Sequence, residues 1–181
     1  MKFVALQNYI HLLTDPVTLK VVQNTLLYIV ILVLFNFLLP YVLSFINTFL
    51  MKRGKHVYKA LLFSSSLIAL VVGAILFQWI FNPVSGPVAA VAESFGITLP
   101  AWSKTPGLVI VIISLVAVYK AFGYNFLILL SGMNSVPEEL IEAAKLEKAS
   151  NRSIFTNIVM PLTSSTAVYI LCMTIAQGLQ Y

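Results

Sequence analysis

Long apolar runs alternate with short polar stretches along this chain. Four of the runs are long enough to cross the hydrocarbon core of a bilayer, which takes about 20 residues of α-helix. These runs cover residues 22–49, 60–81, 108–133 and 162–181. They are too long and too continuous for the strands of a membrane barrel, and a helix pairs its own backbone groups in lipid. The pattern predicts an all-α fold, a polytopic transmembrane helical bundle that forms one domain over residues 1–181.

The polar stretch before the last run predicts two short helices within residues 137–160. Pro137 can open the first, because its missing N–H is not needed at the start of a helix. Ser150 is a suitable N-cap for the second. We expect Met160-Pro161 to end that helix, since the residue before a proline is disfavoured in the α region. Apolar side chains share one face of the second helix at Ile154, Phe155, Ile158 and Val159. Both helices are too short and too polar to span a membrane.

The composition excludes an ordinary water-soluble domain. Of the 181 residues, 60% are hydrophobic and 9% are charged, with a mean hydropathy of +0.95. Soluble domains are about half apolar and about a quarter charged. We therefore expect the lipid bilayer to surround the chain. One cysteine, Cys172, provides neither a disulfide framework nor a metal cluster. We expect no metal site and, despite a net charge of +5, no nucleic-acid partner, because the basic residues lie beside apolar runs.

The basic residues indicate which connections face the cytoplasm. The first connection contains Lys52, Arg53, Lys55 and Lys59, and the third contains Lys145, Lys148 and Arg152. The second connection, residues 82–107, contains one basic residue, Lys104. Lys and Arg near the ends of spans favour the cytoplasmic side. The first and third connections are therefore predicted to be cytoplasmic and the second to lie outside, so the two short helices face the cytoplasm.

Two roles are open to these short helices. They can rest in the lipid interface, or they can fill a groove on another protein. Amphipathicity alone favours the lipid interface. The sequence motifs described next help to decide between the lipid interface and a partner protein.

Several motifs follow one another in the order known from one family. The sequence Glu142-Ala143-Ala144, followed at a fixed distance by Ile158 and Met160-Pro161, resembles the EAA loop of binding-protein-dependent ABC importer permeases. Further matches to the carbohydrate-type permeases of that family are residues 136–140 (VPEEL), 3–9 (FVALQNY), 24–26 (NTL), 79–86 (WIFNPVSG) and 120–125 (KAFGYN). Together they cover nearly the whole chain. The chain resembles the membrane permease of such an importer.

The resemblance implies a permease subunit that imports a sugar or a related polyol or sugar phosphate. The short helices would then dock on an ABC ATPase subunit. The implied contact residues are Glu142, Ala143, Ala144, Ile154, Phe155, Ile158 and Pro161. Glu142 would face a basic group on the ATPase, the alanines would allow close approach, and the isoleucines and Phe155 would supply apolar contact.

The resemblance also implies a second permease subunit and an extracytoplasmic solute-binding protein that delivers solute to the face of residues 82–107. The implied location is the cytoplasmic (inner) membrane of a bacterium or archaeon, as a multi-pass protein. ATP would bind to the partner ATPase. The chain contains no G-x-x-x-x-G-K-[ST] phosphate loop. We therefore expect no enzymatic activity, no catalytic residue and no cofactor in this chain.

Two departures from the family pattern affect this reading. Lys148 occupies the position of the family glycine, which would end the first helix in a left-handed conformation. A lysine adopts that conformation at a cost of about 1 kcal/mol, so either the helices join differently or the fit to the ATPase is altered. The second departure is length. Family members carry a span before the match at residues 3–9 and further spans after residues 178–181, and we expect the chain to lack both, as a fragment or a degraded copy.

Three polar residues within the predicted spans are candidates for the solute path. Lys120 is the one Lys, Arg, Asp or Glu inside a span, where a charge costs about 2.5–3.5 kcal/mol on insertion scales. It either pairs with another group or lines the path. Asn125 and Gln177 either bond neighbouring helices, which is the commoner case, or contact solute.

Two alternative functions remain open. One is a permease for amino acids, peptides or osmolytes, because those permeases share the EAA pattern. The other is a non-transporting, truncated membrane scaffold whose amphipathic loop rests on lipid. Glu142 separates transport from the scaffold, because its replacement by lysine disconnects an ATPase but hardly affects a scaffold.

Overall fold

The computed structural model describes residues 12–105 and 107–180, which form helices, turns and loops. The motif at residues 3–9 lies outside the described residues. The helices are α2 (Pro16–Val33), α3 (Leu39–Phe45), α4 (Lys55–Ser64), α5 (Leu70–Ile80), α6 (Pro87–Ser94), α7 (Leu108–Asn134), α8 (Glu138–Leu146), α9 (Asn151–Ile154), α10 (Met160–Leu162) and α11 (Ser164–Leu179). Shorter helical turns are η1 (Leu34–Leu38), η2 (Ile46–Leu50), η3 (Ser65–Leu67), η4 (Trp102–Lys104) and η5 (Phe155–Val159).

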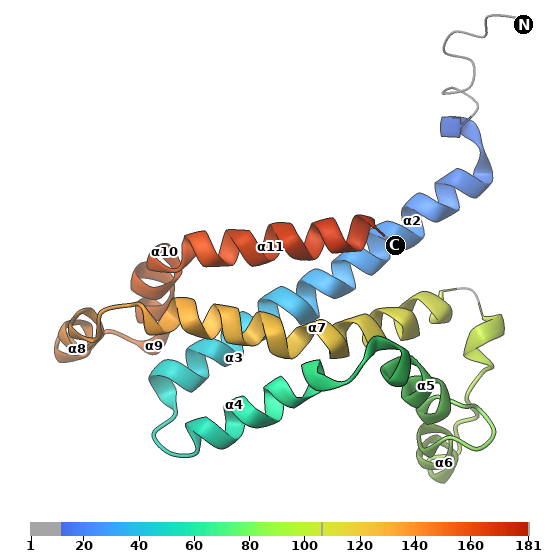
Figure 1. The fold of residues 1–181 in the computed structure, drawn as a ribbon, viewed down its shortest axis with the longest axis horizontal. Helices are drawn as coiled ribbons and strands as arrows, with labels where there is room; N and C mark the ends of the chain where they lie inside the picture. The colour runs from blue at the N-terminus through green and yellow to red at the C-terminus, as the bar shows by residue number, and fades with distance from the viewer. Residues whose placement is uncertain (1–11, 106, 181) are drawn as a thin grey trace, which may run out of the picture.

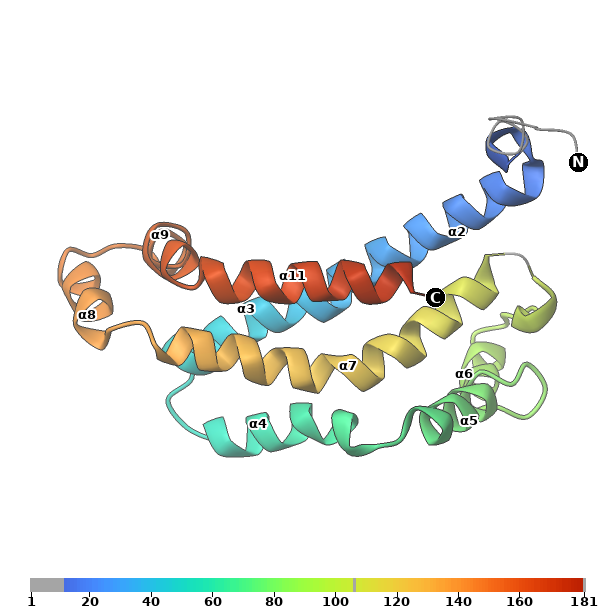
Figure 2. The same ribbon diagram turned by 45° about the horizontal axis from the view of Figure 1, so that its top comes forward.

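Helix α7 is the centre of the bundle. It packs against α2, α3, α4, α5 and α11, and these helices surround it in both ribbon views (Figure 1, Figure 2). Helices α8, α9 and α10 lie at one end of the bundle, together with the connection from α3 to α4 (Figure 1). Helices α5 and α6 lie at the opposite end (Figure 1). The first and third connections therefore share an end, as the distribution of basic residues predicts.

Among residues 12–105 and 107–180, two helices are long and apolar enough to cross a membrane by themselves. They are Pro16–Leu50, which runs through α2 to η2 over 35 residues, and α7 with 27 residues. Two further spans are possible only as bent pairs, since Lys55–Leu67 meets Leu70–Ile80 at 96° and Asn151–Leu162 meets Ser164–Leu179 at 77°. The long helices correspond to the predicted runs 22–49 and 108–133. The runs 60–81 and 162–181 are not straight helices.

Serine side chains explain the break after α4. Ser64 Oγ donates to Leu61 O at 2.7 Å, and Ser65 Oγ donates to Leu62 O at 3.1 Å. Such bonds to the preceding turn compete with the helical pattern and bend helices. The backbone then becomes extended at Ile68, with φ −80° and ψ 133°. An apolar run of sufficient length is therefore interrupted by its own hydroxyl groups.

Prolines in two helices are each preceded by a widened π-helical turn. Turn η1 precedes Leu39-Pro40, and turn η5 precedes Met160-Pro161. Proline lacks an N–H and its ring clashes with the carbonyl four residues earlier, and an extra residue in the turn before it relieves this conflict. The expectation that Met160-Pro161 ends its helix is therefore wrong. The helix continues to Leu162 and bends at the following residue.

The larger hydrophobic core lies at the end that carries α8. Its buried members come from α3, α7, α8, α9, η5 and α11 and from the turn before α8: Tyr41, Phe45, Leu129, Met133, Val136, Ile141, Ile154, Val159 and Ile170. A smaller cluster, formed by Tyr28, Leu32 and Val118, joins α2 to α7 nearer the other end. Helices α8 and α9 each bury one side chain in this core, Ile141 and Ile154, and these side chains attach the short helices to the bundle.

Candidate functional site

Helix α8 presents one buried face and one exposed face. Its N-cap is Pro137, with φ −58° and ψ 128°, and Glu138 and Glu139 occupy the first turn, where the helix dipole favours anions. Ile141 is buried in the larger core with 2% of its surface exposed. Glu142 and Ala143 are exposed, and Ala144 is half-buried. The first part of the expected ATPase contact is therefore open at the surface.

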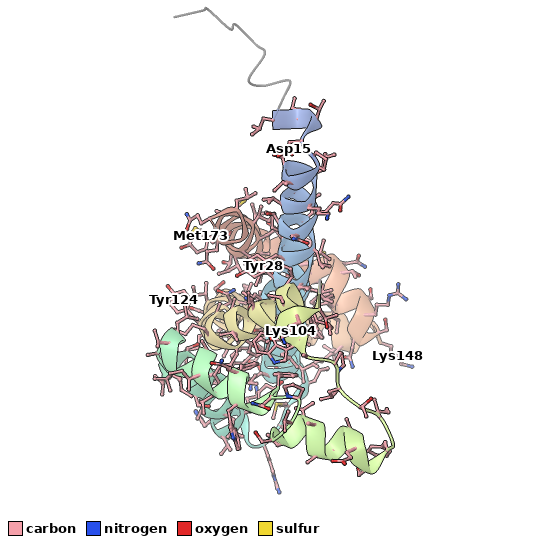
Figure 3. The ribbon with its side chains drawn as sticks, turned by 90° about the vertical axis from the view of Figure 1, so that its right-hand side faces the viewer. Asp15, Tyr28, Lys104, Tyr124, Lys148 and Met173 are labelled. Carbon is pink, nitrogen blue, oxygen red and sulfur yellow. The ribbon has the colours of Figure 1, made fainter. Side chains whose placement is uncertain are left out.

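Helix α8 ends in a left-handed turn at Lys148, which has φ 57°. Ala149 N donates to Ala144 O at 2.9 Å, and Lys148 N donates to Lys145 O at 3.0 Å. These two bonds are the pair that defines a Schellman motif, and its left-handed position usually holds glycine. The short helices are therefore joined as a glycine would join them, and the lysine carries the conformational cost. Its side chain projects away from the bundle (Figure 3).

The second short helix packs on α3 of the same chain. Ser150 caps it as predicted, with its Oγ accepting from Ser153 N at 3.2 Å. The Phe155 ring meets Tyr41 and Phe45 edge-on, at centroid distances of 5.5 and 4.8 Å. Ile154 is buried at 2% exposure, Ile158 packs against the same core, and Pro161 is exposed. The apolar side chains predicted to face an ATPase thus pack into the core of their own chain, Phe155 against α3, and their contact with a partner stays a prediction.

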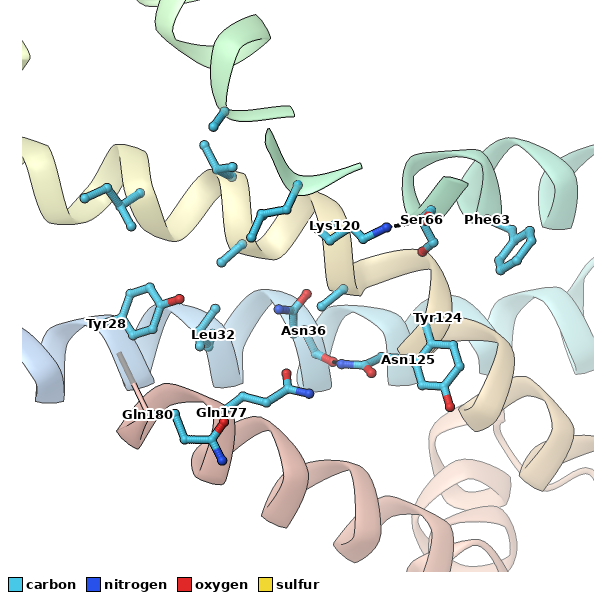
Figure 4. A pocket seen from close by; sticks show the side chains of 16 residues that line it. Tyr28, Leu32, Asn36, Phe63, Ser66, Lys120, Tyr124, Asn125, Gln177 and Gln180 are labelled. Atoms are coloured by element: carbon cyan, nitrogen blue, oxygen red, sulfur yellow. Dashed lines mark hydrogen bonds between the residues drawn. The ribbon is translucent and has the colours of Figure 1, made fainter. Parts of the chain in front are cut away.

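A cavity of about 730 Å³ lies within the bundle between α2, α4, α5, α7 and α11 (Figure 4). All three candidate path residues line it, namely Lys120, Asn125 and Gln177. Its other polar lining residues are Tyr28, Asn36, Ser66, Tyr124 and Gln180. Polar residues far apart in the sequence therefore converge on one cavity, whose remaining lining is apolar.

Asn125 bonds a carbonyl group that Pro40 leaves without its usual donor. Its Nδ2 donates to Asn36 O at 2.9 Å, and Pro40, four residues after Asn36, has no N–H to offer. Asn36 is 2% exposed, and its Oδ1 has no hydrogen-bond partner among the described residues. Asn125 therefore bonds two helices, as expected of a buried amide, and also lines the cavity.

Lys120 reaches across to the break in the predicted second span. Its Nζ donates to Ser66 O at 2.7 Å and to Ile68 O at 2.8 Å. The dashed bond in Figure 4 shows the ammonium group turned toward Ser66. Lys120 therefore pairs with backbone groups of its own chain, which is one of the two alternatives predicted for it. Its side chain also lines the cavity.

Sequence reasoning did not assign five of the polar lining residues to the path. They are Tyr28, Asn36, Ser66, Tyr124 and Gln180. A signal is present in the spacing, because Tyr28, Leu32 and Asn36 recur every four residues, as do Lys120 and Tyr124. Such residues share one helix face. Among the described residues, no three His, Cys, Asp or Glu side chains gather to hold a metal ion.

The motif at residues 79–86 forms a tight turn at the opposite end. Asn82 Oδ1 accepts from Val84 N at 2.9 Å and Ser85 N at 3.1 Å, and Gly86 N donates to Asn82 O at 3.0 Å. A Cβ on Gly86 would lie 2.6 Å from the carbonyl oxygens of Ile80 and Asn82. The turn that leads from α5 to α6 therefore requires Asn82 as hydrogen-bond acceptor and Gly86 as a residue without a Cβ.

Comparison with known proteins identifies the family. Residues 41–180 match the family model described as "Binding-protein-dependent transport system inner membrane component". A similar protein is the sn-glycerol-3-phosphate transport system permease protein UgpA of Brucella abortus, 33% identical over 175 residues. That match covers 93% of this chain and 57% of the relative. The protein of the same name from Yersinia pestis is 28% identical over 172 residues, covering 94% and 57%.

Solved structures share the fold. A bacterial ABC transporter involved in the import of the acidic polysaccharide alginate matches with a TM-score of 0.83 and 19% identity, over 99% of this chain and 63% of that one. A bacterial alginate ABC transporter in complex with an alginate pentasaccharide-bound periplasmic protein matches with a TM-score of 0.81 and 19% identity, over 94% and 60%. The all-α permease fold predicted from the sequence is confirmed.

The matched segment fills a little over half of each curated relative, at 57% of its length. The family description refers to an inner membrane component of a transport system, which confirms the predicted inner-membrane location and the assignment to the membrane subunit and not to the ATPase. Through the match over residues 41–180, this chain belongs to the family of binding-protein-dependent transport system inner membrane components.

Proposed function

We propose that the chain acts as a permease subunit of an ABC importer, and that the cavity lined by Lys120, Asn125 and Gln177 is part of the solute path. The observation that carries the proposal is a cavity of about 730 Å³ inside a bundle of membrane-type helices, with eight polar side chains in an otherwise apolar lining. Polar groups at membrane depth are expensive and commonly mark substrate pathways. A cavity of this size is within the range of small-molecule sites.

The lining favours a hydroxylated solute. Asn125, Gln177 and Gln180 offer amide donors and acceptors, and the exposed Tyr124 offers a phenol group and an aromatic face. Such neutral, two-way hydrogen-bonding groups suit the hydroxyls of a sugar, polyol or sugar phosphate. The similarity to a glycerol-3-phosphate permease and to an alginate importer supports this class. We therefore propose carbohydrate or polyol uptake over the uptake of amino acids, peptides or osmolytes.

Coupling to ATP is assigned to the end that carries α8. Glu142 and Ala143 are exposed there, on a helix whose opposite face is anchored by Ile141. A helix anchored through Ile141 can transmit a push from a docked ATPase to the larger core, and Phe155 and α10 connect that core to α3 and α11. Glu142 would meet a basic group of the ATPase, with Ala143, Ala144 and Pro161 beside it. ATP is bound and hydrolysed by that partner.

Two further partners complete the proposal. A second permease subunit would close the path on the side of this bundle that the chain leaves open, and an extracytoplasmic binding protein would deliver solute at the end that carries α5 and α6. The solved relative in complex with an alginate pentasaccharide-bound periplasmic protein supports the second assignment. Alternating closure of the two permease subunits would move the solute through the membrane.

The coupling assignment is tested by Glu142→Lys in the full-length protein, assembled with its ATPase and reconstituted into vesicles. We expect loss of ATP-driven uptake and weaker retention of the ATPase. Glu139→Lys is the matched control, because Glu139 is exposed on the same helix and lies outside the proposed contact. If Glu142→Lys leaves both uptake and ATPase retention unchanged, the scaffold alternative is favoured.

The path assignment is tested by Gln177→Leu, which removes a polar lining group. We expect uptake to fall severalfold while ATPase attachment persists. Gln78→Leu is the control, because Gln78 is also exposed on an apolar helix but does not line the cavity. Competition among unlabelled sugars, polyols, sugar phosphates and amino acids then identifies the solute class. Equal uptake by the two variants would contradict the path assignment.

A further inference from the structure

We infer that Lys120 is a positioning residue whose ammonium group clamps the break between η3 and α5, and that this break shapes one wall of the cavity. The charge of Lys120 is then directed to the backbone of its own chain. The inference deepens the proposed function and relies on it only for the uptake part of the test below.

The clamp consists of two charge-assisted hydrogen bonds. Lys120 Nζ lies 2.7 Å from Ser66 O and 2.8 Å from Ile68 O. Both carbonyl groups belong to the segment where the helix ends, and Ile68 itself is extended. Hydrogen bonds from an ammonium group to such acceptors are shorter and stronger than those between neutral groups.

The break needs a donor of this kind. The last four carbonyl groups of a helix have no partner within the helix, and the helix end carries partial negative charge. Water satisfies such groups in a soluble protein, but the hydrocarbon core of a membrane contains none. A lysine side chain can cross from α7 to the break, and its charge complements the helix end. Lys120 therefore supplies the hydrogen-bond donor that the carbonyl groups at the break lack.

Helix α7 is shaped to receive the broken segment next to Lys120. Gly123 lies three residues later, on the same face of the helix. A Cβ at this position would lie 2.5 Å from Leu62 O and 2.9 Å from Phe63 Cα. The close approach of the two backbones thus depends on glycine. Lys120 and Gly123 together seat the end of α4 and η3 against α7.

The two sides of the break both contribute to the cavity. Phe63 and Ser66 line it before the break, and Leu70 and Ala74 line it after the break. A change in the angle of 96° between these segments would therefore change the shape of the cavity. Among the described lining residues, Lys120 is the one with a fixed charge. Because the ammonium group of Lys120 binds backbone carbonyls, we assign Lys120 a role in shaping the wall of the path. We assign solute binding to the amide side chains of the lining.

The test measures the geometry of the break directly. In the full-length protein with Cys172→Ser, cysteines replace the exposed residues Leu61 and Val71, which lie on either side of the break. Spin labels on these cysteines report their distance distribution in lipid. We expect one narrow distribution in the parent and in Lys120→Arg, which keeps a charged donor. We expect a broadened or shifted distribution in Lys120→Met, whose unbranched side chain is one atom shorter and has no donor.

A control separates the clamp from a general loss of stability. Tyr41→Phe removes a hydrogen bond far from the break and should leave the distance distribution unchanged. If Lys120→Met does not yield folded protein, Lys120→Gln, which keeps a shorter neutral donor, provides the same comparison. A narrow, parent-like distribution in the variant without a charged donor would overturn the inference.

Uptake measurements add a second readout. With the clamp released, we expect the KM for solute to rise about tenfold and Lys120→Arg to restore it. If distances stay unchanged while anionic solutes alone lose uptake, Lys120 serves the solute and the clamp is excluded. If distances respond as expected but the parent complex transports nothing, the proposed function fails while the clamp stands.

Discussion

The hydroxyl oxygens of Tyr41 and Thr163 lie 2.6 Å apart, although the residues are 122 positions apart in the sequence. Thr163 also donates to Val159 O at 2.7 Å, so Tyr41 is the donor toward Thr163. Thr163 occupies the bend between α10 and α11, and Tyr41 lies in α3. The bent helix that follows α8 is thereby tied to the long first helix.

Removal of the Tyr41 hydroxyl should weaken this tie. We expect Tyr41→Phe to lower stability by about 1 kcal/mol, since one buried hydrogen bond is lost and the ring contacts remain. Thermal unfolding of the purified protein in detergent measures the change. Tyr58→Phe is the control, because the Tyr58 ring packs on Phe126 and its hydroxyl bonds no other described residue. In a Thr163→Val background, Tyr41→Phe should cost much less, and an equal cost would argue against the bond.

Glycine at position 148 should stabilise the end of α8. Lys148 has φ 57°, a conformation that costs about 1 kcal/mol for a residue with a Cβ and little for glycine. Lys148→Gly should therefore raise the unfolding temperature of the full-length protein. Lys145→Gly is the matched control and should lower it, because Lys145 lies within the helix, where glycine costs about 1 kcal/mol. A destabilised Lys148→Gly protein would show that the lysine side chain contributes more than its backbone costs.

The contact of α7 with the end of α4 should not tolerate a side chain at position 123. We expect Gly123→Ala to destabilise the protein by about 1–3 kcal/mol, because its Cβ would clash with backbone atoms of Leu62 and Phe63. Gly73→Ala is the control, since a Cβ there meets nothing within 4 Å and alanine is the better helix former. Thermal unfolding of both variants should show a decrease for the first and none for the second. Equal behaviour would mean that α4 moves away from α7 at little cost.

The turn at the opposite end should depend on Gly86 for the same reason. A Cβ there would lie 2.6 Å from two backbone oxygens, so Gly86→Ala must open the turn between α5 and α6. We expect faster proteolysis of residues 82–107 in that variant than in Ser85→Ala, whose side chain is exposed. Mass spectrometry of the fragments locates the cleavage. Unchanged cleavage rates would contradict the assigned role of the motif.

Hydropathy and charge predicted the features that depend on composition over many residues. Residues 108–133 correspond to α7, and the basic residues correctly placed the connection before α4 at the same end as α8. Local rules also succeeded at Ser150, whose side chain caps its helix. Hydropathy, charge and capping residues depend on the sequence within one turn or one span, so they predict local structure without knowledge of tertiary packing.

The remaining features depend on contacts between distant parts of the chain. The break near Ile68 is stable because Lys120, 52 positions away, bonds the freed carbonyl groups. The helix passes through Pro161 because a widened turn precedes it, whereas the rule for the residue before a proline predicted that the helix ends there. The inward orientation of Phe155 requires the aromatic rings of α3 as neighbours. Sequence patterns identify such residues as polar, aromatic or helix-breaking but do not identify their partners.

The first long helix has a consequence for how the protein sits in its bilayer. Its 35 residues measure about 50 Å at 1.5 Å per residue, whereas the hydrocarbon layer is about 30 Å thick. Even a tilt of about 40° lengthens the crossing to only about 39 Å, so roughly eight residues must emerge into the headgroup region or beyond. The N-terminal end of α2, which carries Lys20 and follows Asp15, extends past the other helices (Figure 1). Because this end carries a charged residue, we expect it to be the part of the helix that emerges from the acyl chains.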